Sequence, residues 1–467
     1  MNPDATVADL SRGLADGTTT SRALVQACLD RIAVLDLRFG AVRCLAADAL
    51  AQADDSDGVR RRGGPRSPLE GLPVLVKDNI DVAGLPTTAG TLALEHSYPS
   101  QDAPLVTRLR AAGAVVVGKT NLTELANFMT QDMPSGYSSL GGQVLNPYDT
   151  ALTPSGSSSG SAAAVALGLC VVAVGTETDG SITSPAAHQS LVGLKPTLGM
   201  VSRTGVLPIA ASQDTPGPLA RTVSDAAALL AVLAGPDPSD AATAQARLGD
   251  VALDAGALRG VRLGVVVGSE PSVRHAEALL ALQGAGAVLV DVEVPEPDDV
   301  AELFVLTYEF GRDVDRYLAT LPGDAPIRTL AALRDWNLDH PEQALKFGQT
   351  HVDAAVAIDH GGTRAAYEAV RSGDLALTTT VLERALGDSL EALVFPGAEG
   401  CSWAARAGWP SIVIPAGYQP KDRRPVGLML VSRPWTDARL LSLAFAYEQA
   451  TLLRRSPQQV NPAAFRA

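Results

Sequence analysis

Residues 155–185 read SGSSSGSAAAVALGLCVVAVGTETDGSITSP, and this stretch decides the fold class. Its serine-rich start is typical of a loop, and Ser161 opens the apolar, alanine-rich helix that follows. The run VVAVG then has the composition of a buried strand and leads into a second loop of small residues. Two serine-bearing loops therefore flank one helix and one strand, which is the alternation of an α/β protein.

The same alternation continues on both sides of this stretch. The apolar patterns predict strands within residues 71–82, 114–117, 261–267 and 288–294, and helices at 103–112 and 122–128. The last two strands enclose a helical segment, as in a βαβ unit. The first of these strands, LPVLV, leads directly into the polar residues Lys77, Asp78 and Asn79.

Residues from about 296 to 390 differ from the rest of the chain, because they are charged and helical in period. We interpret them as an α-rich insertion that covers the site. Strand patterns return in the segment from about 391 to 467, as LVFPG, SIVIPAG and VGLMLV. We therefore expect residues 1–467 to form a single large domain, with a catalytic core at about 65–235.

Composition excludes several classes of protein. Hydrophobic residues make up 46% of the 467 residues, and the formal net charge of −14 argues against nucleic acid as a partner. The only basic run, Arg60 to Arg62, is typical of a solvated loop. The first ten residues lack a secretory pattern and no unbroken run of eighteen apolar residues occurs, so we expect a cytoplasmic protein that does not enter a membrane.

The cysteines and histidines do not suggest a metal site. The chain has 4 cysteines without a C-x-x-C pair, and its 6 histidines lack the spacing of zinc ligands. We expect reduced cysteines and no metal.

Two familiar motifs occur in the chain, and their context argues against both. GAVVVGKT at 113–120 fits the pattern of a phosphate-binding loop, but its central residues form the best strand in the neighbourhood and a helix precedes them. Residues 156–160, GSSSG, fit the nucleophile elbow of α/β-hydrolases with Ser158 at its centre. That elbow needs a hydrophobic strand directly before it, whereas DTALTPS is polar and contains Pro154.

The two serine loops become informative when they are considered together with Lys77. Either loop alone could simply supply turns and caps. However, a serine nucleophile needs a base, and a buried neutral lysine can serve if its pKa falls by about three units from ~10.4. The apolar residues around Lys77 favour such burial. The backbone N–H groups of Thr178, Asp179 and Gly180 precede Ser181 and could stabilise an oxyanion.

These residues and several further segments resemble the amidase signature family. The matching segments are VLVKDNIDVAGLPTTAGT, GAVVVGKTNLTELANF, GGQVLNPY, SGSSSGSAAAVALGL, VGTETDGSITSPA, VGLKPTLGMVSRTGVLPIAASQDTPGPLARTVSDAA, GWPSIVIPAGY and PVGLMLVSRPW. The resemblance implies the amidase signature fold, with a large mixed sheet between layers of helices. It also implies a Ser-Ser-Lys triad in which Ser181 is the nucleophile, Ser157 the bridging serine and Lys77 the base. In this family the bridging serine follows a cis peptide bond, and no cofactor is required.

The implied reaction is amide hydrolysis through an acyl-enzyme. The wording of the loop TETDGS, with Asp179 where many members have glycine, is similar to the branch of bacterial peptide amidases. A peptide C-terminal amide is therefore the first substrate we expect, with other small amides as alternatives, acted on by a monomer or homodimer. The alternative functions are those of a non-catalytic protein that retains the fold, or of a glutamine-dependent amidotransferase subunit.

Four further residues receive hypotheses of lesser weight. Ala126 lies where the family lines the acyl side of its site, so it is a candidate substrate contact. His188 is either a packed helix residue or a substrate contact. Phe347 and Gln349 are interpreted as core of the insertion rather than pocket.

Overall fold

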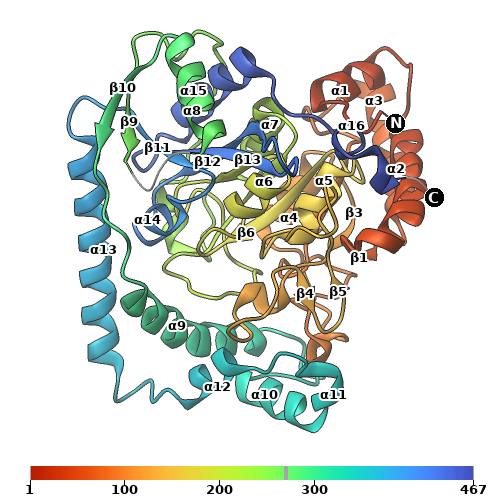
Figure 1. Cartoon of the computed structure of the whole chain (residues 1–467). Helices are drawn as coiled ribbons and strands as arrows, with labels where there is room; N and C mark the ends of the chain where they lie inside the picture. Colours follow the sequence, from red (N-terminus) through yellow and green to blue (C-terminus); the bar gives the residue numbers. More distant parts are fainter. Residues whose placement is uncertain (1, 268–271, 466–467) are drawn as a thin grey trace.

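A computed structural model describes residues 2–267 and 272–465 (Figure 1). Within these residues the main sheet has 11 strands in the order β1-β3-β2-β6-β8-β7-β12-β13-β11-β9-β10. The strands are β1 (Val42–Leu45), β2 (Pro73–Lys77), β3 (Val115–Thr120), β6 (Val172–Glu177), β7 (Val192–Lys195), β8 (Thr215–Ala220), β9 (Arg262–Val266), β10 (Val288–Val292), β11 (Ala392–Pro396), β12 (Ser411–Tyr418) and β13 (Pro425–Val431). A small hairpin, β4 (Tyr137–Ser138) with β5 (Gly142–Gln143), lies apart from it.

The sheet is mixed, as the resemblance to the amidase signature family implies. Strand β2 pairs in parallel with both β3 and β6, and β9 pairs in parallel with β10 and β11. Antiparallel pairs join these two parallel groups through β8, β7, β12 and β13. The predicted βαβ unit is confirmed, since helix α8 (Val273–Gly284) connects β9 to its parallel neighbour β10.

Helices cover both faces of the sheet, because side chains alternate between its faces along each strand. Val74 and Val76 of β2 join one hydrophobic core, and Leu75 between them joins the other. The first core packs against α1 (Val7–Ala15), α4 (Pro104–Ala111), α7 (Val223–Leu233), α8 and α15 (Asp437–Thr451). The second packs against α2 (Ser21–Phe39), α3 (Ala49–Gly63), α5 (Ser159–Ala166), α6 (Thr183–His188) and α14 (Cys401–Arg406). A short helix, α16 (Pro457–Val460), lies near the C-terminus.

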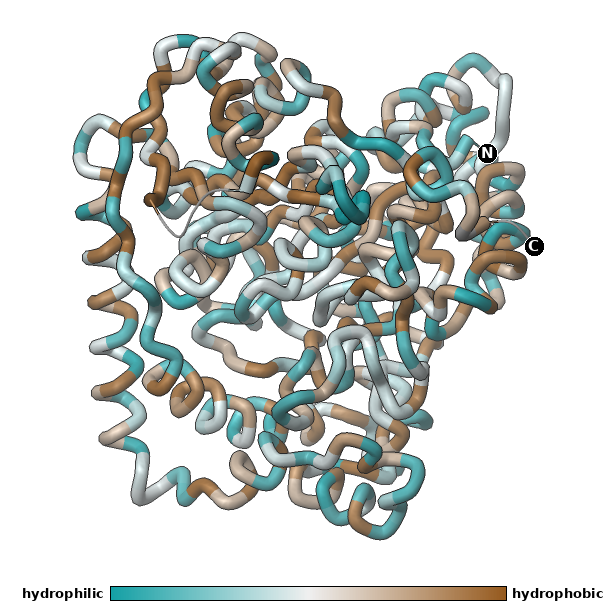
Figure 2. The backbone as a smooth tube through the Cα atoms, viewed as in Figure 1, coloured by the Kyte–Doolittle hydropathy of each residue, from teal (hydrophilic) through white to brown (hydrophobic). Residues whose placement is uncertain are grey.

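The segment between β10 and β11 is helical throughout its regular structure. It contains α9 (Asp299–Ala319), α10 (Leu330–Asp339), α11 (Pro341–Ala344), α12 (Thr350–Ala357) and α13 (Arg364–Leu386). In Figure 1, α9 to α12 lie below the sheet and α13 runs along one side of the molecule. Figure 2 shows α13 alternating between hydrophobic and hydrophilic residues, as expected for a helix that covers a surface.

Three local predictions are wrong. Residues 122–128 do not form an α-helix: Glu124–Asn127 is a 3-10 turn in which Leu125 and Ala126 have φ of 48° and 55°. Backbone N–H groups there have tertiary partners instead, since Leu125 donates to the carbonyl of Ala89 at 2.8 Å. Arg60 to Arg62 lie in the last turn of α3 rather than in a loop. Helix α5 begins at Ser159, earlier than Ser161.

In the part of the chain that the structure describes, no helix combines the length and the apolar character needed to cross a membrane.

Candidate active site

Lys77 is the last residue of β2, and its side chain is completely buried. Its Nζ lies 2.8 Å from Ser157 Oγ, 2.9 Å from Thr176 Oγ1 and 3.2 Å from the carbonyl oxygen of Thr176. Burial lowers the pKa of Lys77 to about 7, although the charges of Asp214 and Glu177 oppose the shift. A lysine with this pKa is largely neutral slightly above pH 7, and can then accept a proton from a hydroxyl.

Ser157 lies in the loop that leads into α5 and is also fully buried. The peptide bond between Gly156 and Ser157 is cis, as the resemblance implies. Gly156 is required here, because a Cβ would lie 2.3 Å from Thr123 Oγ1. The Ser157 carbonyl accepts a hydrogen bond from the N–H of Thr123 at 3.0 Å, which fixes the loop against the turn that contains Ala126.

Ser181 lies between the end of β6 and the start of α6, next to the first serine loop. Its carbonyl accepts a hydrogen bond from the N–H of Ser158 at 3.1 Å, so the residue after Ser157 is tied directly to Ser181. Ser181 is buried, but 6% of its surface remains exposed to solvent. The two serine loops and Lys77 therefore converge on one place, at the ends of the neighbouring strands β2 and β6.

The backbone from Thr178 to Ser181 presents free donors. Among the described residues, the N–H groups of these residues donate no hydrogen bond to a protein acceptor. Gly180 has a φ of 73°, a conformation that favours glycine, and its carbonyl accepts from the N–H of Ser184 at 2.7 Å. N–H groups without protein partners beside a serine are the kind of donor that an oxyanion hole requires.

Glu177 holds the other side of this loop in place. Its Oε2 accepts hydrogen bonds from the N–H groups of Ile182 and Thr183, at 2.7 and 2.8 Å, and from Thr183 Oγ1 at 3.0 Å. A carboxylate at the first turn of α6 satisfies donors that would otherwise lack a partner.

Asp179 is partly exposed, and the buried residues Glu302 and Arg406 lie near it. Burial raises the pKa of both Asp179 and Glu302 of α9, and the charge of Asp179 raises that of Glu302 further. Cys401 lies next to Asp179, and Arg406 lies near both carboxyl groups. Helix α9, in the helical segment between β10 and β11, thus lies close to the loop that precedes Ser181.

The remaining candidates have different surroundings. Ala126 is buried in a cluster that includes Phe310 of α9, in the turn held against Ser157. His188 Nδ1 lies 2.9 Å from the carbonyl oxygen of Ser184 in its own helix. Gln349 is buried and accepts a hydrogen bond from Asn337 at 3.0 Å, as expected for core of the insertion. Phe347 is 37% exposed, so its assignment to that core is wrong.

Ser158 is not an exposed nucleophile. Its side chain is completely buried, and its Oγ donates to the carbonyl of Thr176 at 3.1 Å.

The GAVVVGKT segment forms the buried strand β3, which agrees with the interpretation against a phosphate-binding loop.

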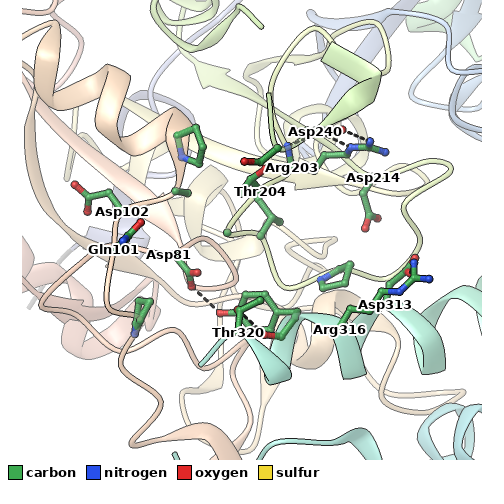
Figure 3. Close-up of a pocket in the computed structure, with 18 of the residues that line it drawn as sticks. Asp81, Gln101, Asp102, Arg203, Thr204, Asp214, Asp240, Asp313, Arg316 and Thr320 are labelled. Carbon is green, nitrogen blue, oxygen red and sulfur yellow. Dashed lines mark hydrogen bonds and ion pairs between the residues drawn. The ribbon is translucent and has the colours of Figure 1, made fainter. Parts of the chain in front are cut away.

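A large cavity of about 590 Å³ is lined by residues that include Asp214, but not by Lys77, Ser157 or Ser181. Figure 3 shows Asp214 on one wall, with Asp313 and Arg316 of α9 nearby and Asp81 further along. The carboxyl groups in this cavity have protein partners: Asp81, for example, accepts a hydrogen bond from Tyr317 at 2.6 Å. In the described ranges, no group of three or more His, Cys, Asp or Glu side chains is arranged to hold a metal ion.

The family model described as Amidase matches residues 23–441 of the chain. The chain belongs to the Amidase family. A protein named probable amidase from Arabidopsis thaliana is 37% identical over 97% of this chain and 91% of its own length. A glutamyl-tRNA(Gln) amidotransferase subunit from Myxococcus xanthus is also 37% identical, over 96% of this chain and 97% of its own.

The solved structures similar to this chain include native peptide amidase from Stenotrophomonas maltophilia. It is 44% identical, with a TM-score of 0.91, and the match covers 97% of this chain and 98% of that one. The amidase signature fold and the resemblance to the peptide amidase branch are thereby confirmed. The family and these neighbours support hydrolysis of amides as the class of reaction.

Several residues that the structure brings to the site were given no role from the sequence. Thr176, Glu177 and Asn79 surround Lys77, and Asn79 Nδ2 donates to Thr176 Oγ1 at 3.1 Å. Gln213 and Asp214 contact Thr178, and both belong to SQDTPGPLAR, which is part of a segment that resembles the family. Polar residues beside the motifs are possible site residues on sequence grounds. Only the fold shows which residues they contact.

Proposed function

We propose that this chain is a serine amidase that cleaves a carboxamide to an acid and ammonia or an amine. The observation that carries the proposal is the 2.8 Å contact between the buried Lys77 Nζ and Ser157 Oγ, in a loop tied to Ser181. A lysine with a pKa of about 7 is a competent general base near neutral pH.

In the proposed mechanism, Ser181 Oγ attacks the amide carbonyl carbon and passes its proton to Ser157, whose own proton moves to Lys77. The negative charge that forms on the carbonyl oxygen is stabilised by N–H groups of the loop at Thr178, Asp179 and Gly180. The proton returns from Lys77 through Ser157 to the nitrogen that leaves, and the C–N bond breaks. Water then attacks the acyl-enzyme by the same proton path, which releases the acid and restores Ser181.

The leading substrate is a peptide C-terminal amide. Support comes from the 44% identity to peptide amidase over nearly the whole chain, and from the loop TETDGS, whose wording resembles that branch. We further propose that residues from about 296 to 390 cover the site, with Ala126 as a contact on the acyl side. The proposed enzyme acts on a small-molecule or peptide amide as a monomer or homodimer, without nucleic acid, a membrane or a cofactor.

The test is ammonia release from a panel of amides by the purified chain. The panel contains amidated dipeptides, simple aliphatic and aryl amides, and free glutamine. The proposal predicts release from amidated dipeptides, and little cleavage of the same dipeptides ending in N-methylamide would show that ammonia is the preferred leaving group. If no amide is hydrolysed and a fluorophosphonate does not label Ser181, the proposed function is wrong.

A glutamine-dependent amidotransferase component is the second candidate, because several relatives carry the name of a glutamyl-tRNA(Gln) amidotransferase. The same panel separates the two functions. Hydrolysis of glutamine but not of peptide amides, with stimulation by partner proteins and tRNA, would favour the amidotransferase.

A further inference from the structure

Two neighbouring residues outside the triad hold the loop that precedes Ser181. Asp214 Oδ1 accepts a hydrogen bond from Thr178 Oγ1 at 2.5 Å, and its Oδ2 accepts from the N–H groups of Ile209 and Ala210, both at 3.0 Å. Gln213 Nε2 donates to the carbonyl oxygen of Thr178 at 3.2 Å. Both side chains are buried, so these bonds are protected from competition with water.

The bond from Gln213 controls the direction of a candidate oxyanion donor. The peptide unit is planar, so the carbonyl of Thr178 and the N–H of Asp179 point in opposite directions from the same rigid plane. Fixing the carbonyl therefore fixes the N–H. The bond from Asp214 holds the side chain of Thr178, which leaves this peptide plane little freedom to rotate.

Gln213 is itself held from the covering segment. An amide nitrogen has two hydrogens to donate, and the second donates from Gln213 Nε2 to Glu302 Oε1 of α9 at 2.8 Å. Glu302 is also buried. A continuous chain of hydrogen bonds therefore runs from α9 through Gln213 to the Thr178 carbonyl, next to the free N–H groups of the loop.

We propose that Gln213 and Asp214 are positioning residues that aim the N–H groups of the loop at Thr178 to Gly180 toward the substrate oxygen, with Glu302 fixing Gln213. This inference rests on the proposed function of that loop as an oxyanion hole. The segment from about 296 to 390 would then affect the chemical step, through Glu302, in addition to enclosing the substrate. The charge that develops on the oxygen is greatest in the transition state, so misdirected donors slow catalysis more than they weaken substrate binding.

The experiment compares Gln213→Met and Thr178→Val with wild type. Gln213→Met keeps the length of the side chain without its donors, and Thr178→Val keeps the shape of the side chain without its hydroxyl. We expect kcat to fall about 10- to 100-fold in each variant, since loss of a whole oxyanion donor costs ~10²–10³. We expect KM to stay within about twofold, which is the sign of an interaction made in the transition state.

A matched control separates positioning from general damage to the fold. Gln349→Met removes another buried glutamine, in the covering segment and away from the loop, so it should lower stability without lowering kcat. On α9, Glu302→Gln retains an acceptor for Gln213 and should retain activity, whereas Glu302→Leu should resemble Gln213→Met. If folded Gln213→Met and Thr178→Val turn over at the wild-type rate, the proposal is wrong. It is also wrong if kcat is unchanged and KM alone rises.

A second readout needs no substrate. The phosphoryl oxygen of a fluorophosphonate occupies the oxyanion position when Ser181 is labelled, so the rate of labelling should fall in Gln213→Met and Thr178→Val but not in Gln349→Met. If wild type is labelled at Ser181 but hydrolyses no amide of the panel, the proposed substrate class fails and the positioning proposal is decided by these rates. Equal labelling rates in all variants would overturn the positioning proposal.

Discussion

Lys77 is the residue on which the proposed chemistry depends, because its protonation state decides whether a proton can leave Ser157. The structure explains its low pKa by complete burial, with three oxygen atoms of Ser157 and Thr176 as its neighbours. Its depressed pKa favours the neutral base, which exists above the pKa and is lost as pH falls below it.

Activity should therefore depend on pH through Lys77. We expect kcat/KM to rise from acid pH and to level off above an apparent pKa near 7, the value that burial gives to Lys77. Lys77→Ala should lose most activity and recover part of it at high pH, where hydroxide can replace the base. A profile measured with wild type and Lys77→Ala checks this, and an unchanged acid limb in the variant would contradict the role of Lys77.

The three proposed catalytic residues are predicted from the sequence, whereas the residues that surround them are not. Lys77, Ser157 and Ser181 stand in motifs that resemble those of the family. Thr176 and Asp214 lie in the same matching segments, but nothing in the sequence gives them a role there. Their contacts join residues far apart in the chain: Lys77 to Thr176 spans 99 positions. Folding alone brings such residues together, so sequence patterns of short range do not find them.

The loop between β6 and α6 carries Ser181 and the proposed oxyanion donors. Glu177 fixes the first turn of α6, Ser184 fixes the carbonyl of Gly180, and Gln213 fixes that of Thr178. With these carbonyls held, the N–H groups of the loop have no protein acceptor, and in the proposed mechanism they bind the substrate oxygen.

Gly180→Ala tests this loop directly. A Cβ at Gly180, where φ is 73°, would be strained and would lie 3.1 Å from Cys401 Sγ. We expect a loss of about 1 kcal/mol or more in the free energy of unfolding, and a fall in kcat as the loop shifts. Urea denaturation and steady-state kinetics measure the two effects. The control is Gly284→Ala, at the end of α8, where the new methyl group meets open space. It should lower neither the free energy of unfolding nor kcat.

Residues 122–128 do not form the helix that their sequence predicts. Its apolar spacing is helical, but the N–H groups of Thr123 and Leu125 donate to Ser157 and Ala89 in other segments. Tertiary hydrogen bonds compete with local ones here, and the turn lies against the bridging serine as a result.

Across the whole molecule, the covering segment joins the core through charged contacts as well as through the hydrophobic cluster of Phe128 and Phe310. Asp374 of α13 pairs with Arg406 at the end of α14, and their side chains are only 7% and 1% exposed. This buried pair connects the long outer helix to the region beside Asp179.

Asp374→Ala should therefore destabilise the protein strongly. Removing the carboxylate leaves the Arg406 guanidinium buried without its partner, which typically costs ~3–5 kcal/mol. The free energy of unfolding from urea titration gives the value. Glu368→Ala on the same helix breaks the exposed pair with Arg364 and should leave that free energy unchanged. Equal effects of the two substitutions would contradict the structural role given to the buried pair.

The order of the strands is the part of the fold that sequence patterns do not supply. The parallel unit of β9, α8 and β10 is local and predictable, whereas β7 pairs with β12, which lies more than two hundred positions later in the chain. Periodicity indicates that each segment is a strand, but pairing depends on which apolar faces fit together in three dimensions.

Ser181 is the proposed nucleophile of this amidase. Ammonia release from an amidated dipeptide by wild type, Ser181→Ala and Ser184→Ala under identical conditions tests this role. Ser184, in the first turn of α6, bonds to Ser155 and serves as the control serine. We predict that Ser181→Ala loses about 10⁴-fold or more of kcat, while Ser184→Ala remains active. Turnover by folded Ser181→Ala at the wild-type rate would contradict the claim.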